Sequence, residues 1–208
     1  VRFNERIVLD GEIVDDARLT EAFARCEAAN QDAPITFFEI TTAAALLLFA
    51  ETPADRLILE VGLGGRFDAT NVIAKPQVTA ITPVSLDHAE FLGTDIAGIA
   101  GEKAGILKTG IPAIVGPQRP EAEDRITAIA NAIGAPARLW DRDYRAWSEQ
   151  GRLVYEEENL LWDLPRPALA GEHQIINAGI AVAAARAAGF AEPAVREGLE
   201  TASWPARL

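Results

Sequence analysis

Short apolar segments alternate with helical stretches through the middle of the chain, and this alternation is the strongest constraint on the fold. Apolar runs of strand length cover residues 56–61, 77–82 and 112–115. Helical periodicity covers residues 94–107 and 121–133. Because strands that alternate with helices form parallel sheets with helices packed on their faces, the pattern predicts an α/β fold with a mainly parallel sheet.

Two helices are expected before the first apolar run. Asp15 or Asp16 can cap a helix that runs to about Asn30, because a short acidic side chain accepts hydrogen bonds from the first turn. Residues 36–50 form a second helical stretch, which is apolar nearly all round and is therefore predicted to be deeply packed. Residues 35–38 are expected to be extended.

The last third of the chain predicts a different arrangement. Residues 138–165 are rich in Trp, Tyr and charge and contain short alternating runs, which predict a small antiparallel subregion. An alanine-rich helix is expected to end near residue 189, and a final helix to cover about 193–201. The expected fold class is a three-layer α/β/α arrangement with a mainly parallel sheet and a small antiparallel patch.

Composition excludes several classes of function. The 208 residues carry 31 acidic and 19 basic side chains, a formal charge of −12, so no nucleic-acid partner is expected. No membrane association is expected either, because the longest apolar run, Ala43–Ala50, is far shorter than the roughly 20 residues of a membrane span. Cys26 is the single cysteine, which excludes an internal disulfide and favours a small core or half-buried side chain in a reducing compartment, the cytoplasm. The chain has no methionine and begins with Val1, so we expect it to be a piece of a longer protein.

Glu60 lies at the end of the apolar run 56–61 and His88 follows the run 77–82, and open α/β sheets bind their ligands beyond such strand ends. A carboxylate and an imidazole that meet at one sheet edge could hold a divalent metal, with positions left for water and phosphate oxygens. The alternatives are a glycine turn with a surface acid after residue 59, and a structural histidine. A dinucleotide fingerprint is not expected, because Phe67 occupies the place of its third glycine.

Lys103 shares an apolar helical stripe with Ile96, Ile99 and Ile106. An ammonium group on that stripe needs a partner or a covalent modification, because burying it alone is costly. The alternative is a lysine whose stem covers the core while its head reaches water.

His173 and Asn177 are four residues apart and share a helix face near an N-terminus, which can receive anions. The alternative is that both residues are early-helix polar side chains without a ligand. The sequence contains no Gly-x-x-x-x-Gly-Lys-Ser/Thr phosphate loop.

Six motifs occur in a recognisable order and spacing. They are VRFNERI at 1–7, TFFE at 36–39, LEVGLGGRFDATN at 59–71, LDH at 86–88, GEKAGI at 101–106 and WPARL at 204–208. Over essentially the whole chain these motifs resemble the folylpolyglutamate synthase/dihydrofolate synthase branch of the Mur ligase superfamily.

The resemblance implies a reaction and a set of small-molecule partners. ATP would phosphorylate a carboxylate to an acyl phosphate, and the amine of L-glutamate would attack it to form an amide. The acceptor would be dihydropteroate, a reduced folate, or both, with Mg²⁺ as cofactor. The resemblance further implies a cytoplasmic monomer.

The resemblance also assigns roles by position. Glu60 and His88 would be magnesium ligands, and Lys103 would carry a carbamate; these three form the implied catalytic set. The remaining implied contacts are Asn177, Arg207 and His173 with ATP, and Thr36, Phe37, Phe38, Arg66, Phe67 and Asp68 with the pteroate.

Parts of the family pattern are expected to lie outside these 208 residues. The family's phosphate loop, with a serine that helps hold magnesium, would precede Arg2, and a C-terminal glutamate-binding domain would follow Arg207. Residues 1–208 would then be the central ATP-binding domain, inactive as a ligase by itself. Two alternatives remain open: another Mur-type amino-acid ligase, such as a cell-wall enzyme, and a truncated domain without catalysis.

Overall fold

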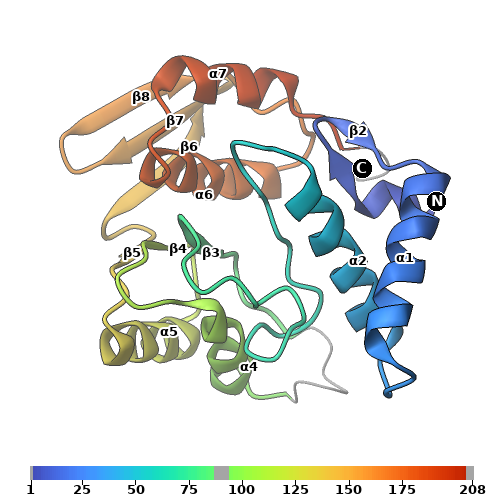
Figure 1. The fold of residues 1–208 in the computed structure, drawn as a ribbon. Helices are drawn as coiled ribbons and strands as arrows, with labels where there is room; N and C mark the ends of the chain where they lie inside the picture. Colours follow the sequence, from blue (N-terminus) through green and yellow to red (C-terminus); the bar gives the residue numbers. More distant parts are fainter. Residues whose placement is uncertain (1, 87–93, 205–208) are drawn as a thin grey trace. The chain divides into compact units, whose positions relative to one another are not determined.

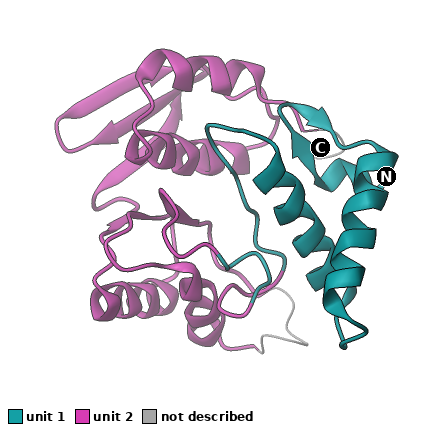
Figure 2. Cartoon of the chain, viewed as in Figure 1, with its two compact units in different colours: residues 1–62, 68–72 teal, residues 63–67, 73–208 magenta. Residues whose placement is uncertain are grey.

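The chain forms two compact units in a computed structural model that describes residues 2–86 and 94–204. Unit 1 consists of Val1–Gly62 and Asp68–Val72, and unit 2 of Leu63–Phe67 and Ile73–Leu208 (Figure 2). The glycine-rich stretch 59–71 therefore contributes its centre to unit 2 and its two flanks to unit 1.

Unit 1 is a small hairpin followed by two helices that pack against each other. The two helices meet around Leu19, Ala22, Ala44 and Leu48, and Cys26 is half-buried against this core, as predicted. In chain order, its elements are η1 (Phe3–Arg6), β1 (Val8–Leu9), β2 (Glu12–Ile13), α1 (Asp16–Asn30) and α2 (Phe37–Glu51) (Figure 1).

Local hydrogen bonds cap the N-termini of α1 and α2. Asp15 accepts a hydrogen bond from the Arg18 N–H (2.8 Å), which confirms the predicted cap of α1. At α2 the Thr36 hydroxyl accepts from the Glu39 N–H (3.2 Å), and the Glu39 carboxylate accepts from the Thr36 N–H (2.8 Å). This capping box satisfies two N–H groups at once, and the hydrogen bonds from the Thr36 hydroxyl and N–H lower the pKa of Glu39.

Two expectations for α2 are wrong. Residues 37–38 are helical rather than extended, because the capping box at Thr36 starts the helix at Phe37. The helix is also not deeply packed: Phe37 is 72% exposed and Phe38 40% exposed, whereas Thr41, Thr42, Ala44 and Leu48 are buried. A helix packed on one neighbouring helix buries one stripe of its surface, whatever the composition of its other faces.

The predicted strand at residues 56–61 is also wrong. The structure assigns no strand there, and Leu57 and Ile58 are 44% and 90% exposed. An apolar run becomes a buried strand only where a neighbouring strand satisfies its peptide groups. In the described part of the chain, the parallel sheet consists of other segments, which are, in order across the sheet, β3 (Thr79–Ile81), β4 (Ala113–Val115) and β5 (Ala137–Leu139).

Unit 2 contains three layers around this parallel sheet. The predicted strands at 77–82 and 112–115 are confirmed as β3 and β4, and β5 is a third parallel strand that the sequence reasoning placed in the antiparallel subregion. The elements are β3 (Thr79–Ile81), α4 (Ile96–Lys103), η2 (Ala104–Ile106), β4 (Ala113–Val115), α5 (Pro120–Ile133), β5 (Ala137–Leu139), β6 (Tyr144–Glu149), β7 (Arg152–Glu157), β8 (Leu160–Leu164), α6 (His173–Ala187) and α7 (Glu192–Thr201).

The central strand β4 shows how the layers are held together. Its side chains alternate between the two faces of the sheet, as in any strand. Ala113 and Val115 pack in the core formed with α4 and α5, whereas Ile114 packs in the core formed with α6. All three residues are at most 1% exposed, so both faces of the sheet are covered and the predicted α/β/α arrangement is confirmed (Figure 1).

The predicted antiparallel patch is confirmed as the meander β6-β7-β8. Gln150 and Gly151 join β6 to β7 with positive φ angles of 48° and 78°, the backbone that a two-residue hairpin turn requires. Helix α6 contacts both β4 and β6, and so it packs against both sheets of unit 2.

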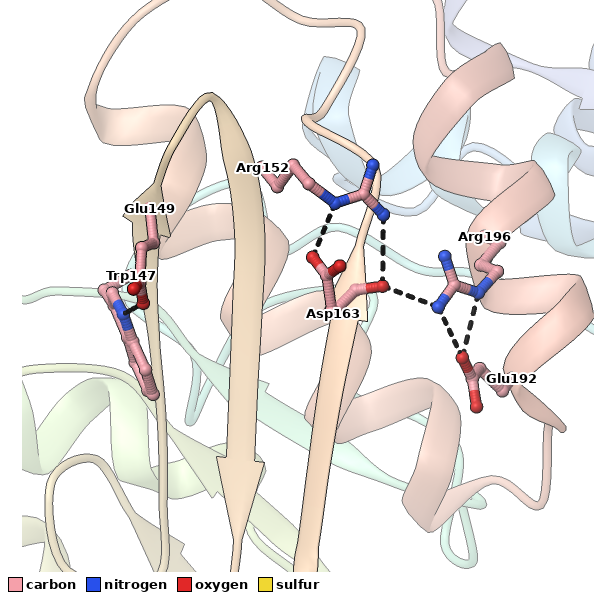
Figure 3. Close-up of polar contacts among 6 residues, drawn as sticks. All are labelled: Trp147, Glu149, Arg152, Asp163, Glu192 and Arg196. Carbon is pink, nitrogen blue, oxygen red and sulfur yellow. Dashed lines mark hydrogen bonds and ion pairs between the residues drawn. The ribbon is translucent and has the colours of Figure 1, made fainter.

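Polar contacts tie α7 to strand β8 (Figure 3). Arg196 of α7 donates to the Asp163 carbonyl oxygen (2.5 Å) and to the Glu192 carboxylate (2.6 Å). Arg152 of β7 donates to the Asp163 carboxylate (2.6 Å) and to the same carbonyl (3.3 Å).

None of the described helices has the length and apolarity of a membrane span.

A buried carboxylate joins both sheets of unit 2 to α6. Glu157 of β7 accepts hydrogen bonds from Arg138 of β5, from the Tyr155 hydroxyl (2.6 Å) and from Arg186 of α6 (2.7 Å). Burial alone would raise the pKa of Glu157, but the bonds from Arg186, Tyr155 and Arg138 outweigh burial and lower the pKa to about 2. Glu157 is therefore ionised at neutral pH and links β5, β7 and α6 to one another.

Candidate functional site

In unit 2 the glycine-rich loop packs directly on the end of the helix that carries Lys103. The Arg66 N–H donates to the Glu102 carbonyl (2.9 Å), and the Arg66 guanidinium lies 3.6 Å from the Glu102 carboxylate. A Cβ at Gly65 would lie 2.8 Å from the Glu102 carbonyl oxygen, and one at Gly105 would lie 2.4 Å from the Arg66 Cβ. Both glycines are therefore required for this close approach of two backbones.

Lys103 is the last residue of α4 and is half-buried. Of the residues predicted to share its apolar stripe, Ile99 is buried in the core that α4 shares with α5, and Ile96 and Ile106 are partly buried against that core. A Cβ at Gly65 would lie 3.0 Å from the Lys103 carbonyl oxygen, so the glycine-rich loop reaches the backbone of Lys103 itself. The fold thus brings the glycine motif and the lysine motif into contact.

In unit 1 the flanks of the same loop are organised by Asp68. One carboxylate oxygen accepts from the Gly62 N–H (3.0 Å), and the other accepts from the Thr70 N–H (2.9 Å) and the Thr70 hydroxyl (2.5 Å). The Asp68 carbonyl accepts from the Asn71 N–H (2.9 Å). Asp68 therefore acts in the fold as the residue around which the loop turns.

An aromatic ring lies next to this carboxylate. The Phe38 side chain packs on the Gly62 backbone so closely that a Cβ at Gly62 would lie 2.4 Å from the ring. Since Gly62 also donates to Asp68, the outer edge of the Phe38 ring and a carboxylate both contact one glycine, within unit 1. Phe38 and Asp68 are 30 residues apart in the sequence and come from different motifs, so the fold brings together two of the predicted pteroate contacts.

The other predicted pteroate contacts are arranged differently. The Thr36 hydroxyl donates to Glu39 (2.6 Å) within the capping box, and the Phe37 ring packs edge-on against Phe3 with 5.7 Å between ring centroids. Arg66 and Phe67 belong to unit 2, where Arg66 pairs with Glu102 and Phe67 is 88% exposed.

At the start of α6, the buried Gln174 links two of the three predicted nucleotide contacts. Asn177 donates to the Gln174 side-chain oxygen (3.2 Å), and the Gln174 side-chain nitrogen lies 3.2 Å from a ring nitrogen of His173. Gln174 and Asn177 line one end of a mainly apolar groove of about 390 Å³ between α6 and α7. Sequence reasoning missed Gln174; its signal was its place between His173 and Asn177 at the beginning of a helix.

The predicted metal site falls partly outside the described residues. His88 lies in the segment 87–93 and Arg207 in 205–208, which the structure does not describe. Glu60 is described and exposed. Among residues 2–86 and 94–204, no three His, Cys, Asp or Glu side chains gather as a metal-binding group.

Comparison with known proteins places the chain in a family. No family model matches it. The chain is 36% identical over 229 residues to the folylpolyglutamate synthase of Lacticaseibacillus casei, covering 100% of the chain and 53% of that protein. It is 38% identical over 214 residues to the dihydrofolate synthase/folylpolyglutamate synthase of Escherichia coli, covering 100% of the chain and 48% of that protein. The chain belongs to the folylpolyglutamate synthase/dihydrofolate synthase family.

Solved structures of this family share the fold. The structure of E. coli FolC in complex with DHPP and ADP has a TM-score of 0.89 at 36% identity and covers 99% of this chain and 49% of FolC. A folylpolyglutamate synthase/dihydrofolate synthase with Mn, AMPPNP and L-glutamate bound has the same TM-score and identity, over 100% of this chain and 50% of that one. The chain thus spans about half the length of the L. casei and E. coli proteins.

Proposed function

We propose that the protein to which this chain belongs is an ATP-dependent ligase that adds L-glutamate to dihydropteroate, to reduced folates, or to both, through an acyl phosphate. The observation that carries the proposal is the meeting of the Phe38 ring and the Asp68 carboxylate at Gly62. A flat heterocycle with N–H donors suits an aromatic face next to a carboxylate. The names of the relatives, and the DHPP and ADP bound to E. coli FolC, support this substrate class.

In this proposal the chain is the central ATP-binding domain, and residues 138–165 form its antiparallel subregion. Thr36, Phe37, Arg66 and Phe67 would complete the pteroate pocket. The protein would act as a monomer in the cytoplasm.

The nucleotide would be bound by Asn177 and His173, together with Arg207. Gln174 would orient both α6 side chains, since its amide lies within hydrogen-bonding distance of each. The AMPPNP bound to a similar solved structure supports a nucleotide as a substrate.

A divalent cation, Mg²⁺ in this proposal, would be held by Glu60 and His88. The carboxylate of Glu60 fits the preference of Mg²⁺ for oxygen ligands, and a carbamate on Lys103 would offer further oxygens. The cation would neutralise phosphate charge when bound. Glu60, His88 and Lys103 form the proposed catalytic set, and the Mn bound to a similar solved structure supports a divalent metal as cofactor.

The test is the Glu60→Gln variant of the complete protein. We expect it to abolish phosphate release that depends on ATP, dihydropteroate and glutamate together, because the variant lacks a charged metal ligand. Glu200→Gln, an exposed glutamate on α7, is the matched control and should keep wild-type turnover. Near-normal turnover of Glu60→Gln would contradict the assignment, and turnover that needs a cell-wall precursor in place of dihydropteroate would favour another Mur-type ligase.

A further inference from the structure

The Asp68 carboxylate is held in one orientation by its own loop. The donors that reach it include the Gly62 N–H, the Thr70 N–H and the Thr70 hydroxyl. The two donors of Thr70 converge on the same oxygen, at 2.9 and 2.5 Å, while Gly62 binds the other oxygen at 3.0 Å. Contacts to both oxygens fix the rotation of the carboxylate plane about the bond that joins it to Cβ.

The Thr70 hydroxyl is the only side-chain group among these three donors. Threonine is branched at Cβ and stiff about χ1, so its hydroxyl is held in place and loses little rotational freedom on bonding. Asp68 and Thr70 are both half-buried, which strengthens a hydrogen bond to an ionised group relative to one in water.

The orientation of the Asp68 carboxylate matters because it decides which N–H groups the carboxylate can bind. A carboxylate that recognises neighbouring N–H groups of a flat heterocycle must lie near the plane of those groups, beside the ring that stacks on the heterocycle. The Phe38 ring is fixed against Gly62, which also donates to Asp68, so ring and carboxylate share one anchor. Binding sites require such groups to be held within about 10–20° of the productive geometry by supporting residues.

We propose that Thr70 is a positioning residue for pteridine recognition: its hydroxyl holds the Asp68 carboxylate in the orientation that binds the heterocycle. The inference rests on the proposed function, because it assumes that Asp68 faces the pteridine. It goes further by giving a distinct role to a residue that would not touch the substrate.

The experiment compares Thr70→Val, Thr70→Ser and Asp68→Ala in the complete protein. Valine keeps the shape of threonine and removes the hydroxyl, whereas serine keeps the hydroxyl. We expect Thr70→Val to raise KM for dihydropteroate about tenfold, the effect of losing one hydrogen bond to a charged group. Its kcat at saturating dihydropteroate and its Kd for AMPPNP should stay within about twofold of wild type, and Thr70→Ser should restore most of the affinity.

The matched control is Thr201→Val on α7, which also removes a hydroxyl bonded within its own segment, to the Glu197 carbonyl (2.7 Å). It should leave KM for dihydropteroate unchanged. A Thr70→Val effect that lowers kcat and nucleotide affinity equally would indicate a general loss of structure and overturn the positioning role. Circular dichroism and the rescue by serine guard against a variant that fails to fold.

Failure of the inference is distinguishable from failure of the proposed function. A large rise in KM for Asp68→Ala with no rise for Thr70→Val would overturn the role of Thr70 alone. An unchanged KM for both variants would remove Asp68 from the pteroate pocket, and the proposed function would lose its main support.

Discussion

The buried ion cluster at Glu157 gives a quantitative prediction about stability. In the complete protein, Glu157→Gln removes the charge and leaves Arg138 and Arg186 without the anion that both of them bind. A pKa of about 2 in the folded chain, against 4.5 for an ordinary glutamate, corresponds to about 3 kcal/mol of stabilisation at neutral pH. The side chain is only 10% exposed, so solvent screens little of this contribution.

The sign of the pH dependence follows from the lowered pKa. The contribution of Glu157 is fully present above the unfolded pKa of 4.5 and is lost as the pH falls towards about 2, where the folded carboxylate also takes up a proton. We expect the wild-type protein to be about 3 kcal/mol more stable than Glu157→Gln at pH 7, and the difference to shrink steadily below about pH 5.

The assay is urea unfolding followed by tryptophan fluorescence, since Trp162 stacks under Arg186 at 4.6 Å and reports on this region. The matched control is the adjacent Glu156→Gln, whose partner Arg145 is 55% exposed and whose loss should change stability by less than about 1 kcal/mol. A Glu157→Gln variant as stable as Glu156→Gln at pH 7 would refute the reasoning, as would a stability difference that does not change between pH 7 and pH 3.

Three further outcomes are expected in the complete protein. Thr36→Ala should lower stability by about 1 kcal/mol in thermal unfolding, because α2 loses its capping box, and Thr36→Ser should not; equal stability of both would contradict this. Gly105→Ala should lower ligase turnover by about tenfold or more, because its Cβ would meet the Arg66 Cβ at 2.4 Å and displace the loop, and wild-type turnover would show that the loop position is unimportant. Asn177→Ala should raise KM for ATP about tenfold and leave KM for dihydropteroate unchanged; an unaltered KM for ATP would remove Asn177 from the nucleotide site.

Local signals in the sequence were enough for the helices and for β4. The cap at Asp15 depends on neighbours a few residues away, so its meaning does not change with the rest of the fold. The apolar run 113–115 alternates with helical stretches along the chain, and this alternation predicted the strand that helices cover on both faces. The run 56–61 looked equally apolar, yet its state depends on whether a distant strand pairs with it, and no local pattern carries that information.

The candidate site, too, could be predicted from local sequence signals only in part. The motifs indicated Phe38, Asp68 and Lys103 as site residues. Their spacing could not show that Phe38 and Asp68 both contact Gly62. It also could not show that the loop packs on the helix of Lys103 at Gly65 and Gly105. Those contacts arise from tertiary packing between segments 24 to 40 residues apart in the sequence. Gln174 was missed for a related reason. Its role depends on the burial of its side chain, and burial of a polar residue near the start of a helix cannot be predicted from the local sequence.

The tight turn at Gln150 and Gly151 has a consequence for the order of folding. Strands β6 and β7 pair residues that are close together along the chain, and so closing the hairpin loses little chain entropy. The parallel pair β3 and β4 instead joins residues separated by more than 30 positions. We therefore expect the meander to form early and to provide the surface on which α6 condenses, so that its amides gain protection from hydrogen exchange before those of the parallel sheet during refolding.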